Sequence, residues 1–219
     1  MPQRTLSLRP KYLIFALALL MFAYVLWHNE SFLIHPQAPV WRHYQPFKWW
    51  LLAHGLAGAC GLFIAPLQLS DRLRQRHTKL HRVLGRIYVA AVFTAGPLGI
   101  YIKYFGERMG DSRTFTMAAM THGGFWMLTT AIALAFILRG RVQQHRQWMT
   151  RSVFVGPGVF LGVRAMEGVT GLDKLGPAVD EACVWFCIAF AILLADFVIQ
   201  WQELSRYRRS AAKVQAAAR

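Results

Sequence analysis

Four histidines lie in or beside long apolar segments, where an ionisable side chain is costly and is commonly functional. They are His54, His81, His122 and His145. If the apolar segments span a membrane, His54 and His122 lie about one and a half to two turns below its outer face. His81 and His145 lie near the inner face, and they share a depth only if the helix that carries His145 begins inside the preceding basic loop. Two neutral imidazoles from opposed helices can ligate one haem iron, so the spacing predicts two sites for b-type haem.

Small residues share the helical faces that carry these histidines. A flat cofactor could approach the backbone there, and the alternative is that the small residues let helices pack closely, as they commonly do in membranes. Separate zinc or copper sites are less favoured, because two histidines alone rarely complete one. The three faces are His54, Gly58, Gly61, Ala65 and Gln68; His81, Gly85, Tyr88, Val92, Gly96 and Gly99; and His145, Met149, Ser152 and Gly156.

The composition predicts the elements that must position these residues. The chain has 219 residues, of which 55% are hydrophobic and 16% are charged. A soluble domain usually carries about a quarter of charged residues. We therefore predict an all-α, polytopic membrane helical bundle that forms a single domain over residues 1–219, with an uncleaved first helix rather than a signal peptide. The expected spans, about six, are residues 12–27, 49–69, 83–104, 114–138, 153–170 and 182–201.

The basic residues predict an orientation. The formal net charge is +15, and most of the basic residues fall in alternate loops or at the termini. The positive-inside rule then puts both termini in the cytoplasm, and it assigns the charge to orientation and anionic lipid, not to nucleic acid. The three cysteines lie inside apolar segments, so a disulfide framework is not expected. No Cys-x-x-Cys-His motif supports covalent haem attachment.

Charged residues near the histidines have two interpretations each. Arg164 and Glu167 are three residues apart, so they can form an ion pair within one helix, or Arg164 could face a haem propionate or an anionic substrate. Asp196 is expected to pair with a loop arginine. The arginines around the inner histidines suit topology and lipid headgroups, or else propionate or substrate contacts. They are Arg82, Arg86, Arg146 and Arg151.

Three short motifs resemble those of a known family. They are Pro66-Leu67-Gln68, His81-Arg82-x-x-Gly85-Arg86-x-Tyr88-Val89 and His145-x-x-Trp148-Met149-x-Arg151-Ser152, with His54-Gly55 before them. Together they resemble the prokaryotic membrane proteins of the DUF2306 family, over roughly residues 54–164. This resemblance implies a helical protein of the bacterial inner membrane and assigns no activity.

The order of the histidines is similar to that of two-haem b-type cytochromes of the b561 kind. In those proteins the second and fourth spans ligate one haem, and the third and fifth spans ligate the other. The resemblance implies that His54 pairs with His122 and that His81 pairs with His145.

These observations lead to one preferred function and two alternatives. The preferred function is a transmembrane electron carrier that holds one or two b-type haems and takes electrons from a quinol or a small reductant. The first alternative is a haem-free small-molecule transporter or binder built on Arg164, Glu167 and the central glycines. The second is an accessory or structural subunit whose basic face contacts lipid or a partner. The sequence leaves the oligomeric state open.

Overall fold

The computed structural model describes residues 45–170, 172 and 176–217, with positions 16, 19, 20, 23, 24, 27, 35 and 37 before them. All elements in this part of the chain are helical, which confirms the all-α class. The predicted first span, 12–27, lies largely outside the described residues. The elements are the 3-10 helix η2 (Gln45–Phe47), α3 (Lys48–Gln68), α4 (Asp71–Arg76), α5 (Thr78–Arg108), α6 (Arg113–Leu138), α7 (Val142–Val153), the π-helical turn η3 (Phe154–Gly158), α8 (Val159–Thr170) and α9 (Pro177–Ala217).

Four of the described helices are long and apolar enough to cross a bilayer. They are Gln45–Gln68, Thr78–Arg108, Arg113–Leu138 and Ala178–Ser205. Each exceeds the roughly 20 residues that a hydrocarbon core of about 30 Å requires. They correspond to the predicted spans 49–69, 83–104, 114–138 and 182–201, so the chain is a multi-pass membrane protein.

The fifth predicted span, 153–170, is built differently from the other four. The chain is helical from Val142, and α7, η3 and α8 follow one another without a break. The π-helical turn contains Pro157, which has no backbone N–H to donate, with a glycine on each side. Because this helix begins at Val142, His145 is helical. This meets the condition under which His145 and His81 could lie at the same depth.

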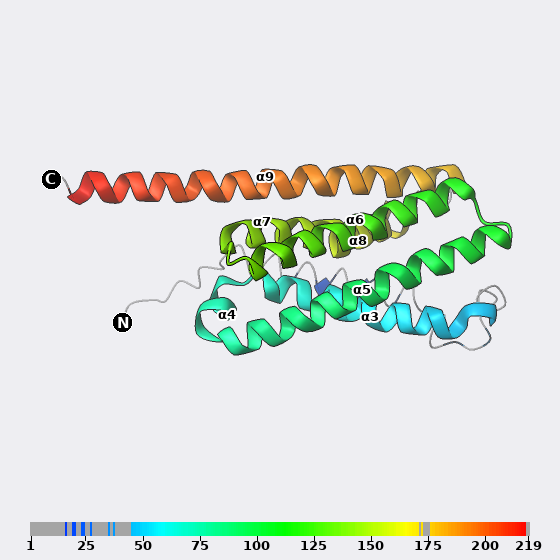
Figure 1. Ribbon diagram of the computed structural model, residues 1–219. Coiled ribbons are helices and arrows are strands. Elements are labelled where there is room, and N and C mark those ends of the chain that lie inside the picture. The colour runs from blue at the N-terminus through cyan, green and yellow to red at the C-terminus, as the bar shows by residue number, and fades with distance from the viewer. Residues whose placement is uncertain are drawn as a thin grey trace, which may run out of the picture.

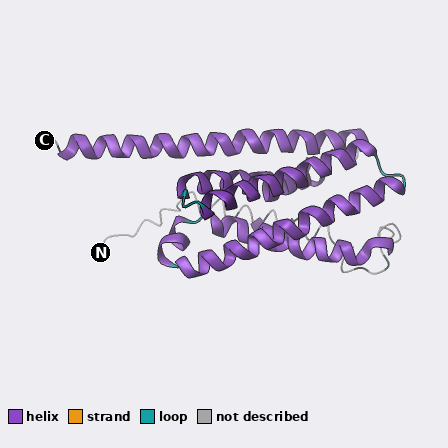
Figure 2. Ribbon diagram, in the orientation of Figure 1, coloured by secondary structure: helices purple, strands orange, loops and turns teal. Residues whose placement is uncertain are grey.

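The helices run side by side along one axis (Figure 1). One end of the bundle holds α4 and the turn between α6 and α7, and we call it the basic end, because α4 alone carries Arg72, Arg74 and Arg76. The opposite end holds the α5–α6 turn and the start of α9. The 41-residue α9 would measure about 60 Å, and it extends past the other helices at the basic end (Figures 1 and 2).

The contacts between helices follow the chain order in part. Helix α3 packs mainly on α5, α5 on α6, α6 on α7, and α8 on α9. Large apolar side chains on the outside of the bundle are exposed, as lipid contact would require. On α9 they form a row that includes Phe186, Phe190, Leu193, Phe197 and Trp201.

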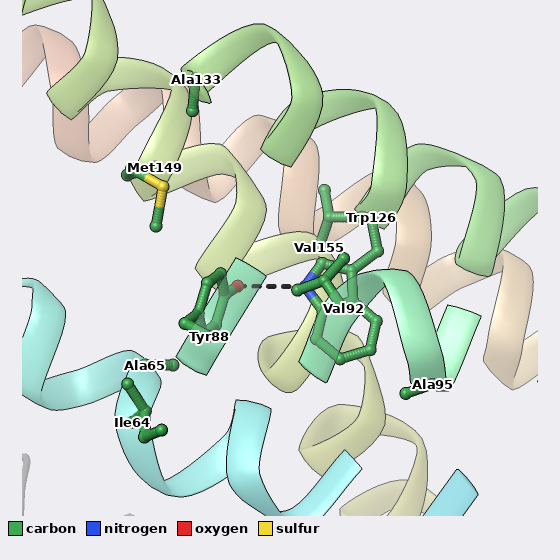
Figure 3. Packing of buried hydrophobic residues seen from close by; sticks show 9 residues of the cluster. All are labelled: Ile64, Ala65, Tyr88, Val92, Ala95, Trp126, Ala133, Met149 and Val155. Carbon is green, nitrogen blue, oxygen red and sulfur yellow. Dashed lines mark hydrogen bonds between the residues drawn. The ribbon is translucent and has the colours of Figure 1, made fainter. Parts of the chain in front are cut away.

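The main core lies between α3, α5, α6 and α7 (Figure 3). Tyr88 and Val92 of α5 are fully buried in it, and Ala65 of α3 and Ala133 of α6 pack there with no exposed surface. Trp126 of α6 reaches across this core toward Tyr88, so that one large side chain connects two helices at mid-bundle (Figure 3).

Candidate functional site

A closed ring of hydrogen bonds lies in the core between α5, α6 and α7. The hydroxyl of Tyr88 lies 2.8 Å from the hydroxyl of Ser152, which lies 2.7 Å from the hydroxyl of Thr130. The indole N–H of Trp126 donates to the Tyr88 oxygen at 3.0 Å (Figure 3). Thr130 donates to the backbone carbonyl of Trp126 at 2.7 Å.

The donor and the acceptor of every hydrogen bond in this ring follow from the number of protons that each group can donate. Each hydroxyl has one proton to donate. Thr130 uses its proton on the carbonyl of Trp126, so Ser152 must donate to Thr130, and Tyr88 must donate to Ser152. Tyr88 can then accept from the indole of Trp126. All four polar groups are satisfied in a site where an unpaired group would be costly, so the ring fixes how three helices face one another.

The three sequence motifs meet around this ring. Tyr88 belongs to the motif that starts at His81, and Ser152 belongs to the motif that starts at His145. Gln68 of the third motif donates to the backbone carbonyl of His81 at 3.3 Å. Its side chain also lies against Gly85, where a Cβ would come within 3.3 Å of the amide oxygen of Gln68. The motif residues therefore pack against one another on the basic-end side of the core.

His81 of α5 and His145 of α7 both lie at the basic end. The two imidazoles lie within electrostatic reach, and the Arg74 guanidinium is near both. The Nδ1 atom of His145 donates to the carbonyl of Ala133 at 2.8 Å, which fixes the ring and directs Nε2 away from that bond. The Nδ1 atom of His81 is buried and has no hydrogen-bond partner within the described residues.

His54 of α3 and His122 of α6 lie nearer the opposite end, and their imidazoles are also within electrostatic reach. The Nδ1 atom of His54 donates to the carbonyl of Ala95 at 2.8 Å. The His54 ring lies against Gly99, where a Cβ would come within 2.8 Å of Cε1. His122 uses the other ring nitrogen from His54. Its Nε2 atom donates to the carbonyl of Val155 in the π-helical turn at 2.8 Å.

The glycines on the histidine faces are filled by protein side chains at several positions. A Cβ on Gly156 would overlap the indole of Trp126, and one on Gly61 would lie 3.1 Å from the same ring. A Cβ on Gly96 would lie 2.8 Å from Met127. Gly58, in contrast, has nothing within 4 Å of such an atom. Close helix packing therefore accounts for Gly61, Gly96 and Gly156 in this structure.

The charged residues near the histidines divide into three ion pairs and two exposed arginines. Arg146 of α7 pairs with Asp71 of α4 at 3.3 Å. Arg151 of α7 binds Asp196 of α9 at 2.7 Å, which confirms that Asp196 pairs with an arginine from the basic segment. The predicted pair within one helix is also confirmed, with Arg164 lying 3.1 Å from Glu167. Arg82 and Arg86 are exposed at the basic end.

The sequence interpretation missed the α6 side of the site. Thr130 and Trp126 complete the ring, yet neither was selected as a candidate. The available signal was the presence of two adjacent threonines, Thr129 and Thr130, in the middle of an apolar span, because a hydroxyl buried in a bilayer needs a partner. Backbone carbonyls one turn earlier in α6 supply part of that need. Thr129 donates to the carbonyl of Phe125, and Thr130 donates to that of Trp126.

The imidazole geometry tests whether haem iron fits each pair. Histidines that ligate a metal usually donate their other ring nitrogen to a carbonyl or carboxylate. His145 meets this pattern through Ala133. The buried Nδ1 of His81 has no hydrogen-bond partner within the described residues, so it is open to ligation and the basic-end pair could hold haem iron without breaking a hydrogen bond of His81 Nδ1. The opposite pair fits only after rearrangement, since ligation through Nε2 of His122 would break its bond to Val155. Within the described residues, no group of three or more His, Cys, Asp or Glu could hold a metal ion.

The comparisons with known proteins give one match. The family model described as predicted membrane protein (DUF2306) matches residues 51–199, which is well over half of the chain and contains all three motifs and all four histidines. Searches of the curated proteins and of the solved structures found no match.

Proposed function

We propose that this chain, which belongs to the DUF2306 family of predicted membrane proteins, binds b-type haem and carries electrons across the bilayer. The observation that carries the proposal is that four histidines from four helices lie at two levels of the bundle. His81 and His145 lie at the basic end and His54 and His122 nearer the opposite end, and the members of each pair interact electrostatically although they are about 65 residues apart in the chain. A function in packing alone would not require imidazoles to meet in pairs at two levels of a membrane protein.

The basic-end pair is the better-prepared site. Haem iron held there would accept and pass on one electron at a time. His145 would hold the iron through Nε2, with Ala133 keeping the ring in orientation. His81 would supply the other nitrogen ligand, and Gln68 stabilises the backbone that carries it. Arg82 and Arg86 are the candidates to balance the propionate charges, because both are exposed beside this pair.

The second site requires a local change at the π-helical turn. His122 must release the carbonyl of Val155 before its Nε2 can ligate a metal, and Trp126 and Met127 must leave room near Gly156 and Gly96. Arg151 and Arg164 are less suited to a propionate role than Arg82 and Arg86, since Asp196 and Glu167 already pair with them. One haem at the basic end is therefore the minimal form of the proposal, and two haems are its full form.

The proposed setting is the bacterial inner membrane, with both termini and the basic end in the cytoplasm. The charge asymmetry supports this orientation. The electron donor would then be a quinol in the bilayer or a small reductant at the cytoplasmic face, where His81 and His145 lie nearest to water.

An absorption spectrum of the purified protein tests the proposal. Protein produced with an adequate haem supply should show a Soret band, and dithionite should produce an α-band. A colourless preparation that also fails to take up added haemin would contradict the proposal, and it would favour a haem-free binder or an accessory subunit.

Histidine variants test the pairing. His81→Ala and His145→Ala should remove the same band, and the double variant should remove no more, because two ligands of one iron act as a unit. His77→Ala is the matched control, since His77 is exposed four residues before His81 on the same segment. A loss of haem in the His77 variant equal to that in the His81 variant would contradict the assignment of the basic-end site.

A further inference from the structure

Two sulfur atoms meet between α8 and α9, and a third lies one helical turn away on α9. The thiol of Cys187 lies 3.6 Å from the thioether sulfur of Met166. Cys183 lies four residues before Cys187, which puts the two side chains on one face of α9. Both cysteines are buried, with exposed fractions of 3% and 6%.

The spacing of the two cysteines does not suit a disulfide. Residues four apart on a helix have Cβ atoms about 5–6 Å apart, whereas a disulfide needs a Cβ separation of about 3.5–4.5 Å. Both thiols are free in the structure. A ligand that sits between two sulfurs can bridge the longer distance, because two metal–sulfur bonds add to the reach of the side chains.

We propose that Cys183, Cys187 and Met166 form a binding site for a soft monovalent metal ion, specifically Cu(I). Thiolate and thioether sulfurs are the ligands that select Cu(I) over harder ions. Two sulfurs bound at about 2.3 Å to one three-coordinate metal would be about 4 Å apart, and the Cys187–Met166 separation of 3.6 Å is close to this value. The third donor is a thioether, so the site differs in kind from a zinc site built of cysteine and histidine.

A glycine packs against the Cys187 thiol, and acidic residues lie nearer the opposite end of the bundle. Gly162 of α8 faces Cys187, and a Cβ there would lie 3.2 Å from the thiol sulfur. Glu167 and Asp180 lie near the thiols. Cys183 is six residues from the start of α9 at Pro177, or about 9 Å along the helix. An ion arriving at this end would therefore meet acidic side chains before it reached the sulfurs.

The charge balance of binding is simple. Each thiol that becomes a thiolate releases one proton, and the metal keeps its oxidation state. With both cysteines bound as thiolates, as metal ligation requires, two protons are released, and Cu(I) with two thiolates and one thioether carries a net charge of −1. This proposal does not depend on haem, since it uses none of the four histidines.

Competition with a chromogenic Cu(I) chelator, under anaerobic conditions in detergent, tests the site. The wild-type protein should remove one equivalent of Cu(I) from bicinchoninate, and Cys187→Ser and Cys183→Ser should each abolish this. Met166→Leu should weaken binding by at least about tenfold, because even groups that only support a metal ligand commonly contribute that much. Sulfur-only coordination in the X-ray absorption spectrum of the copper-loaded protein would identify the donors.

The third cysteine provides the matched control. Cys60 is exposed on α3 and lies far from the other two in the chain, so Cys60→Ser should bind Cu(I) as the wild type does. Retention of the metal by Cys183→Ser/Cys187→Ser, or equal loss in Cys60→Ser, would overturn the proposal. Thermal unfolding of each variant without metal separates loss of the site from loss of the fold.

Discussion

The two ends of the bundle differ in the balance of their interhelical bonds. On the basic-end side, side chains bind one another in Tyr88–Ser152, Arg151–Asp196 and Asp71–Arg146, beside the bonds of Gln68 and His145 to backbone carbonyls. Toward the opposite end, His54 and His122 bind backbone carbonyls and Arg164 pairs within its own helix, while the exposed Arg113 of α6 lies 3.9 Å from Glu107 of α5.

This difference accounts for part of the motifs. A bond between two side chains requires both residue types, so it leaves a pattern in the sequence, and Tyr88, Ser152 and Arg151 of the basic-end motifs form such bonds. A bond to a carbonyl requires one residue type and a particular backbone shape. The opposite end therefore depends on features such as Pro157 and the glycines beside it, which leave a weaker pattern.

The largest expected effect concerns which end faces the cytoplasm. Alkaline phosphatase folds only outside the cytoplasm, so a fusion after Glu107, at the opposite end, should be active. A fusion after Arg141, at the basic end, should be inactive, because positively charged segments stay inside. Colony colour on a phosphatase substrate measures this, and the reverse pattern would overturn the proposed orientation.

Gly156→Ala should have the largest effect on stability. The new methyl group would overlap the rigid indole of Trp126, and overpacking of this kind costs about 1–3 kcal/mol or more. Gly158→Ala is the control two residues away, where the nearest atoms would be 3.5 Å from the new carbon. Thermal unfolding in detergent measures both. Equal melting temperatures for the two variants would contradict the dependence on backbone shape at the π-helical turn.

Tyr88→Phe should destabilise the protein by about 1–2 kcal/mol. The change removes the acceptor of the Trp126 indole and the donor to Ser152 while keeping the aromatic ring. Tyr104→Phe, at an exposed position on the same helix, should have little effect.

Ser152→Ala adds a test of the ring as a unit. Combined with Tyr88→Phe, it should cost less than the sum of the two single changes, because both remove the same hydrogen bond. Simple additivity of the two unfolding free energies would show that the hydroxyls act independently.

The smallest expected effect is the difference in coupling energy between two ion pairs, Arg164–Glu167 and Arg151–Asp196. In a membrane, the unfolded reference state keeps its helices, so Arg164 and Glu167 remain neighbours in it and their coupling should be at most about 0.5 kcal/mol. Arg151 and Asp196 come from different helices and separate on unfolding, so a coupling of about 1 kcal/mol is expected. Double-mutant cycles with neutral replacements, Arg→Gln with Asp→Asn or Glu→Gln, measure both energies.

A larger coupling for Arg164–Glu167 than for Arg151–Asp196 would reverse the comparison between the two ends. Glu167→Gln alone should still be more harmful than Arg164→Gln/Glu167→Gln. The single change leaves the Arg164 charge without its carboxylate, and the double change removes both charges.

Much of the fold could be predicted from the chain alone. Apolar length identified the segments that became α3, α5, α6 and α9, because a helix in hydrocarbon must satisfy its own backbone bonds whatever its neighbours are. The spacing of Arg164 and Glu167 predicted their ion pair, since residues three apart on a helix are neighbours. The early start of α7 remained only a condition for pairing His145, because the basic segment around it has no apolar length to mark a helix.

The tertiary structure decided what occupies the space between the helices. The sequence identified Gly61, Gly96 and Gly156 as small residues on histidine faces, but either a cofactor or a side chain could fill such space. Trp126 and Met127 fill it here, and their reach across the bundle depends on how α6 is rotated against α3, α5 and α7. The same rotation brings Thr130 and Ser152 together from positions 22 residues apart. Helix formation is a local property of the chain, whereas the rotation of each helix follows from all of its neighbours at once.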